Sequence, residues 1–100
     1  MLQLSVKLQL ALDTLEREHA LKLTELAALY VDALEAGTPF LKFVGIRIVS
    51  DLKNAHLDKI ILTEMKSSDV SAYEAQMAFD NGGDIVTTQG ITTLATIREV

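Results

Sequence analysis

The segment IILTEMKSSD, residues 60–69, decides the fold because it begins as an apolar run and ends in ionisable and helix-starting side chains. In an extended chain, side chains two positions apart point to the same side, so Glu64 and Lys66 share one face at the end of a strand. The two serines and Asp69 that follow are residue types that start helices, and residues 72–79 have a helical pattern. The segment predicts a strand–helix unit with polar groups at the carboxyl end of its strand. The alternative is an ordinary strand end, with Asp69 as the N-cap of the helix.

Composition narrows the class of protein. A chain of 100 residues with 49% hydrophobic residues and a single proline is expected to form one small domain, or a piece of a larger one, and not to be disordered. A formal net charge of −5 without a basic cluster argues against a nucleic-acid partner. The absence of cysteine excludes disulfides, thiolate nucleophiles and Cys-type zinc sites. With no basic-then-apolar leader and no apolar run long enough for a bilayer, we expect a cytoplasmic protein without a membrane partner.

The first part of the chain repeats the strand–helix pattern. Residues 7–13 alternate between apolar and polar side chains, as in a half-buried strand, and residues 16–30 have apolar residues at helical spacing. Residues 31–35 predict a second strand. Each of these strands ends in a carboxylate, Asp13 in the first and Glu35 in the second.

A turn over residues 36–39 is expected to start the second helix, with Thr38 as its N-cap. The apolar residues of 41–52 recur at helical spacing and predict one helix that runs through Gly45. His56 is expected in a solvated loop after this helix.

The remaining units follow the same pattern. The third strand covers residues 59–66, and the helix after it has the capping-box spacing of Ser71 and Glu74. The sequence Asn-Gly-Gly at 81–83 is expected to end that helix. The last elements are a strand over 84–89 and a helix over 92–100.

These four units predict an α/β fold with a parallel sheet. Successive strand ends are about 22 to 29 residues apart, as expected when one helix connects neighbouring parallel strands. Right-handed crossovers then place helices outside a parallel sheet, in either an open doubly wound sheet or half of a (β/α)8 barrel. Carboxylates at three successive strand ends favour the barrel, and their hard oxygens suit Mg²⁺. Equally, these residues could simply cap the following helices. The expected organisation is one (βα)4 half-barrel domain over residues 1–100, with an extension over residues 1–6.

Four motifs stand at successive predicted strand ends: LQLALD at 8–13, LEAGTP at 34–39, EMKSSD at 64–69 and DIVT at 84–87. They resemble the strand ends of the 3-hexulose-6-phosphate synthase family. This family belongs to the orotidine monophosphate decarboxylase suprafamily, together with 3-keto-L-gulonate-6-phosphate decarboxylase. The motifs occur in the family's order and at its separations, and the resemblance covers the first four of eight βα units.

The resemblance implies a carbon–carbon lyase of the aldehyde-lyase type that uses Mg²⁺ and joins formaldehyde to ribulose 5-phosphate through an enediolate. The family's DxKxxD motif falls on Glu64, Lys66 and Asp69, the implied catalytic residues. Glu35 and Glu64 are the implied metal ligands. Lys66 would neutralise the enediolate charge and, with Asp13, bind the sugar phosphate. Asp69 would act in the site of a neighbouring subunit.

The sequence also departs from the family. Glu64 stands where the family has aspartate, Ser71 where it has glycine, and Gln89 where it has an apolar residue. The later barrel strands, where phosphate usually binds, have no counterpart in the chain. The alternatives are an enzyme of the 3-keto-L-gulonate-6-phosphate decarboxylase type and a non-catalytic, degenerate half-barrel. Because four strands cannot close a barrel, we expect a homodimer or a larger homo-oligomer.

Overall fold

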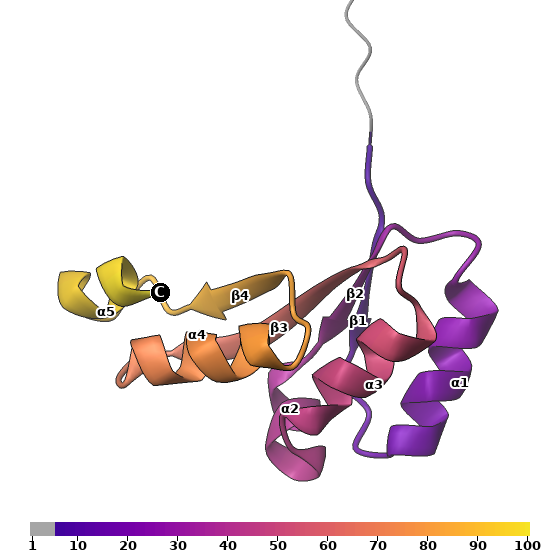
Figure 1. The fold of residues 1–100 in the computed structure, drawn as a ribbon, viewed down its shortest axis with the longest axis horizontal. Coiled ribbons are helices and arrows are strands. Elements are labelled where there is room, and N and C mark those ends of the chain that lie inside the picture. The colour runs from indigo at the N-terminus through magenta and orange to yellow at the C-terminus, as the bar shows by residue number, and fades with distance from the viewer. Residues whose placement is uncertain (1–5) are drawn as a thin grey trace, which may run out of the picture.

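In the computed structural model, four strands alternate with helices along the chain (Figure 1). The structure describes residues 6–100, so the expected extension over residues 1–6 lies, but for Val6, outside the described residues. The strands are β1 (Gln9–Leu12), β2 (Ala33–Ala36), β3 (Ile60–Ser67) and β4 (Ile85–Thr88). The helices are α1 (Arg17–Ala27), α2 (Thr38–Val44), α3 (Arg47–Ala55), α4 (Ser71–Asp80) and α5 (Leu94–Glu99). No helix of the described residues is both long and apolar enough to cross a bilayer.

The strands pair in the order in which they occur in the chain. All three pairings are parallel, and the sheet order is β1-β2-β3-β4. A doubly wound sheet reverses its strand order at a switch point, whereas a barrel adds each strand to the previous one. The sequential order therefore decides between the two predicted folds in favour of half of a (β/α)8 barrel, and the prediction of a parallel sheet is confirmed.

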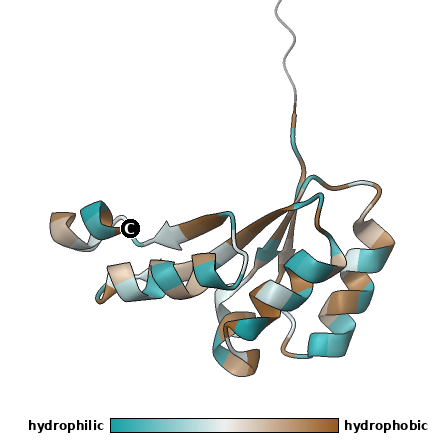
Figure 2. Ribbon diagram, viewed as in Figure 1, coloured by the Kyte–Doolittle hydropathy of each residue, from teal (hydrophilic) through white to brown (hydrophobic). Residues whose placement is uncertain are grey.

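The two faces of the sheet differ in character. Side chains on the helix-covered face, among them Leu34 and Ile61, are fully buried and pack with Phe40 and Leu52. Burial of each such side chain contributes about 1.5 to 3 kcal/mol. The helices carry both hydrophobic and hydrophilic residues, as expected for helices that cover one face of a sheet (Figure 2). The other face carries the charged side chains Glu35 and Glu64, because residues alternate between the faces, while Thr63 is buried on the helix-covered face.

The prediction of one helix through Gly45 is wrong, because the chain forms two helices there. Gly45 has a φ of +90°, a conformation outside the helical region that glycine adopts without strain. Its N–H donates to the carbonyl oxygen of Leu41 at 2.8 Å and so closes the last turn of α2. The apolar spacing continues across the break because α3 packs on the same side of the sheet, where Ile48 and Leu52 are buried.

Both predicted helix caps are also wrong. The N-cap of α2 is Gly37, and Thr38 is the first helical residue, with its hydroxyl directed to β3. The N-cap of α4 is Val70, which has a left-handed backbone and no side-chain cap. Ser71 and Glu74 therefore do not form a capping box: the Ser71 hydroxyl is buried and donates to a main-chain carbonyl of α5. In both cases a tertiary partner replaces the local one.

His56 is not a solvated loop residue as predicted. It is the C-cap of α3, it is half-buried, and its Nε2 lies 2.9 Å from Oγ1 of Thr24 on α1. The contact joins α3 to α1 on the outside of the sheet. The first helix is also shorter than predicted and ends at Ala27.

Candidate functional site

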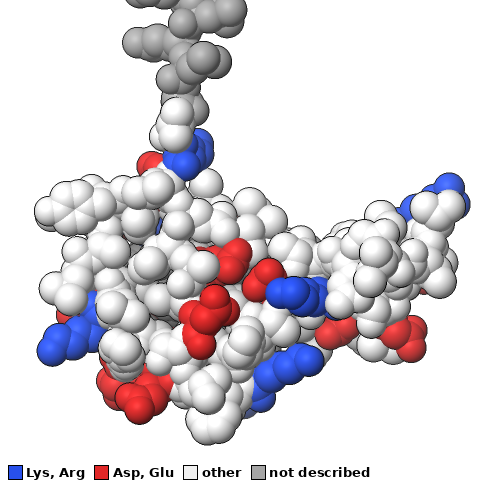
Figure 3. Space-filling model, turned by 180° about the vertical axis from the view of Figure 1, so that it is seen from behind, with Lys and Arg blue, Asp and Glu red and all other residues white. Residues whose placement is uncertain are grey.

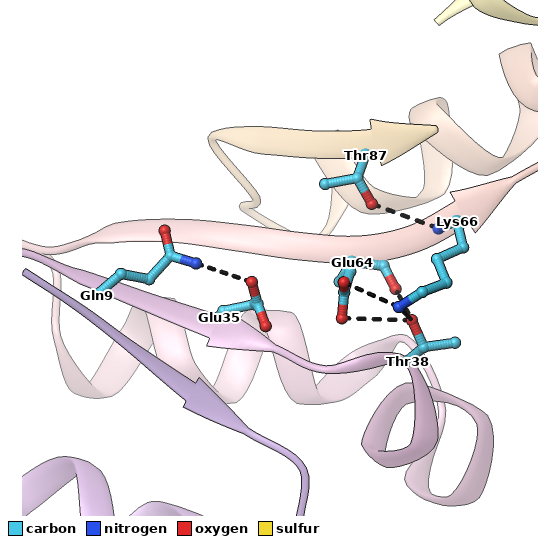
Figure 4. Close-up of polar contacts among 6 residues, drawn as sticks. All are labelled: Gln9, Glu35, Thr38, Glu64, Lys66 and Thr87. Atoms are coloured by element: carbon cyan, nitrogen blue, oxygen red, sulfur yellow. Dashed lines mark hydrogen bonds and ion pairs between the residues drawn. The ribbon is translucent and has the colours of Figure 1, made fainter. Parts of the chain in front are cut away.

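The carboxyl ends of β2 and β3 bring charged side chains onto the face of the sheet that the helices leave open. Glu35 lies one residue before the end of β2, and Glu64 and Lys66 lie in the last part of β3. Glu35 pairs in register with Leu62, so the three side chains project from adjacent strands on the same side (Figure 4). Asp13 follows the end of β1 directly. The structure thus places four of the five predicted site residues at one edge of the sheet.

Glu64 and Lys66 form an ion pair. The Lys66 ammonium lies 2.9 Å from Glu64 Oε1 and 3.1 Å from the hydroxyl of Thr38. The hydrogen bond from Lys66 is the main reason that the pKa of Glu64 is lowered; burial opposes this effect, and Thr38 adds to it. The side chains of Glu64 and Lys66 are 26% and 49% exposed, so the pair contributes at most about 1 kcal/mol to stability. The ion pair therefore adds little stability, but it holds an ammonium at the carboxyl end of β3.

Glu35 has a different environment. The side-chain amide of Gln9 on β1 donates to Glu35 Oε1 at 2.8 Å. Burial, followed by the negative charges of Glu64 and Asp13, raises the pKa of Glu35, although Lys66 and Gln9 lower it in part. Glu35 is thus a carboxylate close to other negative charges, an arrangement that a bound cation would relieve.

Asp13 lies tightly against Gly37 at the ends of β1 and β2. A Cβ atom at Gly37 would lie 2.0 Å from Oδ1 of Asp13 and 2.6 Å from the carbonyl oxygen of Leu12. The Gly37 N–H donates to the same carbonyl at 2.9 Å. Only glycine fits this contact, which explains why this residue follows Ala36 in the LEAGTP motif.

Asp69 does not join the other predicted site residues. It is exposed on the loop between β3 and α4, and its Oδ1 accepts a hydrogen bond from the N–H of Val70 at 2.8 Å. Within the described part of the chain, no hydrogen bond or ion pair connects Asp69 to Glu35, Glu64 or Lys66. Its expected role in a neighbouring subunit's site stays a prediction.

The backbone is irregular where these residues are presented. The register between β3 and β4 shifts between Thr63 and Ser67, and Lys66 has a φ of 50°. A non-glycine residue in this left-handed region costs free energy, and such residues cluster at functional sites. The hydroxyl of Thr87 on β4 accepts a hydrogen bond from the Lys66 N–H at 3.3 Å. The bulge and this contact fix the direction in which the lysine leaves the strand.

Three polar neighbours of the site were not predicted from the sequence: Gln9, Thr38 and Thr87. The alternation of residues 7–13 already placed Gln9 on the same face as Asp13. In the β1–β2 register Gln9 pairs with Ala33, and its side-chain amide reaches diagonally to Glu35. Thr38 was interpreted as a local cap. No sequence pattern indicated its contact with a residue 26 positions away.

The carboxylates agree in type with a magnesium site. Acidic side chains gather near the middle of the face opposite to that in Figure 1, with basic side chains beside them (Figure 3). Mg²⁺ is commonly bound through one or two carboxylates, with water and substrate oxygens completing its shell. Glu35 and Glu64 match that donor set. Within residues 6–100, no group of three or more His, Asp or Glu side chains is arranged so that it could hold a metal ion by itself.

Fold and site together define a protein of the (β/α)8-barrel type with an acid–lysine cluster at the carboxyl edge of its sheet, where barrel enzymes build their active sites. The sequence profile of the orotidine 5'-phosphate decarboxylase / HUMPS family matches residues 6–100. The chain belongs to this family.

Similar proteins agree with that assignment. The 3-hexulose-6-phosphate synthase of Mycobacterium gastri is 44% identical over 85 residues, which are 85% of this chain and 41% of the relative. A crystal structure of 3-hexulose-6-phosphate synthase matches with a TM-score of 0.92 and 42% identity, over 94% of this chain and 45% of the other. The 3-keto-L-gulonate-6-phosphate decarboxylase from Vibrio cholerae matches with a TM-score of 0.91 and 33% identity, over 93% and 44%. The chain thus spans less than half the length of these proteins, as expected for half of a barrel.

Proposed function

We propose that this chain carries the metal-binding and lysine-bearing half of an active site of the 3-hexulose-6-phosphate synthase type. The proposed reaction joins formaldehyde to ribulose 5-phosphate by way of an enediolate. The observation that carries the proposal is the Glu64–Lys66 pair at 2.9 Å, beside Glu35 on the adjacent strand. The similarity to proteins named 3-hexulose-6-phosphate synthase supports this choice of reaction.

Each residue has a proposed task. Glu35 and Glu64 would hold Mg²⁺, which supplies positive charge to substrate oxygens when bound. The Lys66 ammonium would stabilise the negative charge that develops when a C1 proton leaves ribulose 5-phosphate, since a preorganised cation favours the charged state over the neutral one. Asp13 would accept hydrogen bonds from substrate hydroxyls at the neighbouring strand end. Asp69 would complete the site of a second subunit.

Enediolate formation can be tested before carbon–carbon bonding. The wild-type chain should exchange a C1 proton of ribulose 5-phosphate for deuterium in the presence of Mg²⁺, measured by ¹H NMR in D₂O. Lys66→Ala should lower this rate about 100-fold, the loss typical for one group that stabilises developing negative charge. Lys22→Ala is the matched control, because Lys22 is exposed on α1 and away from the strand ends. Equal rates for wild type, Lys66→Ala and a protein-free sample would identify a non-catalytic half-barrel.

The same assay tests the identity of Glu64. Its side chain is one methylene longer than the aspartate that the DxKxxD motif prescribes, and a site tolerates misplacement of only about half an ångström. Glu64→Asp should therefore raise the exchange rate. A lower rate would show that the surrounding contacts, including that with Thr38, are adjusted to glutamate.

A second candidate is an enzyme of the 3-keto-L-gulonate-6-phosphate decarboxylase type. It is favoured by the structural match to the Vibrio cholerae enzyme, whose TM-score is nearly equal to that of the synthase. Both candidates need an enediolate, so the proton exchange does not separate them. Product formation does: a hexulose phosphate formed from formaldehyde supports the synthase, and release of CO₂ from a keto-gulonate phosphate supports the decarboxylase.

We also propose that the chain acts in the cytoplasm as a homodimer or larger homo-oligomer. In the described sheet, β1 and β4 each pair with only one neighbour, and Ile85 on β4 is 45% exposed. Unpaired strand edges and exposed apolar side chains are commonly covered by another chain. A second copy should bury more than about 1,000 Å² in total. Light scattering at micromolar concentration should give at least twice the monomer mass of 10.9 kDa, and a stable monomer would contradict the proposal.

A further inference from the structure

The side chain of Thr38 connects two βα units at the site. Thr38 is the first residue of α2, three positions after Glu35, but its hydroxyl contacts β3 and not its own helix. Its Oγ1 lies 2.8 Å from the main-chain carbonyl oxygen of Glu64, 3.1 Å from the Lys66 ammonium and 3.4 Å from Oε2 of Glu64. One hydroxyl thus touches both members of the ion pair (Figure 4).

The donors and acceptors of this contact can be assigned. An ammonium can only donate, and a threonine hydroxyl has one proton and two lone pairs. Lys66 must therefore donate to Thr38, and the single hydroxyl proton goes to the nearer acceptor, the main-chain carbonyl of Glu64 at 2.8 Å. The Thr38 hydroxyl is thus a hydrogen-bond bridge from the lysine side chain to the backbone of β3.

This bridge limits where the lysine can point. An ammonium carries three N–H donors on a flexible four-carbon stem. Glu64 Oε1 takes one donor at 2.9 Å and Thr38 takes a second at 3.1 Å, which leaves a third for a substrate oxygen. Without Thr38 the ammonium would keep one partner and could rotate about it. Electrostatic stabilisation requires that the cation is already in place when charge develops.

We propose that Thr38 is a positioning residue, whose hydroxyl holds the Lys66 ammonium at the strand end with one donor directed to the substrate. The hydrogen bond that holds the ammonium is a property of the chain alone, and only its effect on the reaction rate rests on the proposed function. The residue acts through the Lys66 ammonium.

Three variants test the hydroxyl separately from the packing. Thr38→Val keeps the shape but removes the hydroxyl, and Thr38→Ser keeps the hydroxyl but removes the methyl group. Thr38 also lines a cavity of about 120 Å³ with mainly apolar walls, so valine should be tolerated there. Thr38→Ala replaces the valine variant if that one does not melt cooperatively. Thr92→Val is the control, because it removes a threonine hydroxyl that is bonded to Ser68 and not to Lys66.

The first measurement is independent of activity. In ¹⁵N-labelled protein at mildly acidic pH, the side-chain ammonium signal of Lys66, assigned with Lys66→Arg, should exchange slowly with water in the wild type and in Thr38→Ser. Thr38→Val should speed this exchange at least about tenfold, because one of the two hydrogen bonds that protect the ammonium is lost. Thr92→Val should leave it unchanged. The same exchange rate in wild type and Thr38→Val would overturn the proposal, whether or not the chain is active.

The second measurement is the exchange of the substrate C1 proton. Thr38→Val should lower kcat about tenfold or more with little change in KM, because a hydrogen bond to the charged group is lost, and Thr38→Ser should restore most of the rate. A purely structural role would not be rescued by serine. If the wild type shows no proton exchange but its ammonium responds to Thr38→Val as expected, the positioning role stands and the proposed function fails.

Discussion

The left-handed backbone of Lys66 predicts an unusual effect of glycine on stability. Glycine in a strand is ordinarily less stable than alanine by about 0.5 to 1 kcal/mol. At Lys66, with a φ of 50°, every residue with a Cβ atom carries a strain of about 1 to 2 kcal/mol, which glycine does not. Glycine also gives the unfolded chain additional freedom, which costs about 0.4 to 1 kcal/mol. Lys66→Gly should therefore be more stable than Lys66→Ala by roughly 0.5 to 1 kcal/mol.

The two variants form a matched pair, since both remove the ammonium and its bonds to Glu64 and Thr38. Their free energies of unfolding can be compared by urea denaturation at one pH, and the difference corresponds to roughly 2 to 6 °C in melting temperature for a chain of this size. Ala11→Gly is the control: Ala11 is exposed on β1 and is not among the positive-φ residues, so glycine should destabilise it. If Lys66→Gly instead has the lower free energy of unfolding, the backbone at Lys66 is not strained and the reasoning is refuted. Both variants lack the ammonium, so both should exchange the C1 proton of ribulose 5-phosphate more slowly than the wild type.

Three further changes test the frame around the site. Gly37→Ala should destabilise the chain by about 1 to 3 kcal/mol in urea denaturation, because its Cβ meets the main-chain oxygen of Leu12 at 2.6 Å; an unchanged midpoint would show that β1 and β2 can separate without cost. Asp84→Asn should cost about 1 kcal/mol at neutral pH. Burial raises the pKa of Asp84, but hydrogen bonds from a main-chain N–H and from Lys53 lower it by more, so the folded state favours the ionised carboxylate. This stabilisation is present above the pKa of Asp84 in the unfolded chain and should vanish as the pH falls through its lowered pKa in the folded chain; a difference in stability that stays constant with pH would contradict the prediction. Glu35→Gln should raise the free energy of unfolding at neutral pH by less than about 1 kcal/mol, since burial and nearby negative charge raise the pKa of Glu35 and so disfavour its ionised form in the folded chain. Thermal melts at a pH below the pKa of Glu35 in the unfolded chain should show no gain, and a loss of stability at neutral pH would refute the prediction.

The fold was predictable because each element carries its own signal. Alternation at residues 7–13 and the apolar start of residues 60–69 identified strands, and the spacing of strand ends identified one helix between each pair. The strand order was not determined by these patterns, since a doubly wound sheet has the same elements. It is settled by which strands share hydrogen bonds, and no residue of an isolated strand encodes its neighbour.

The errors arose where tertiary contacts override local preference. Gly45 interrupts a pattern whose apolar periodicity is unbroken, because two short helices on one face of a sheet require the same spacing as one long helix. Ser71 has the sequence of a capping residue, yet its hydroxyl finds a partner in α5. Such choices depend on elements distant in the chain, which residue types at fixed spacing do not reveal.

The site was predictable in its charges and not in their support. Parity alone placed Glu64 and Lys66 on one face, the predicted strand ends identified Asp13 and Glu35, and the resemblance implied their roles. The uncharged residues that contact them, Gln9 and Thr38, were identified only from the hydrogen bonds of the structure. Two charges at a strand end can be read from sequence, but a geometry fixed to fractions of an ångström depends on neighbours from other units.

The consecutive order of the strands also bears on how the chain folds during its synthesis. Every strand pairs with the next one, about 21 to 27 residues later, so each loop that must close is shorter than a pairing between distant strands would require. Chains emerge from the ribosome N-terminus first, and each new strand finds its partner already made. Glu35 and Glu64 come together when β3 joins β2, and β4 then adds the bulge and the Thr87 contact that fix the direction of Lys66. The two carboxylates are therefore assembled first, and the orientation of the lysine is set only when the fourth strand pairs.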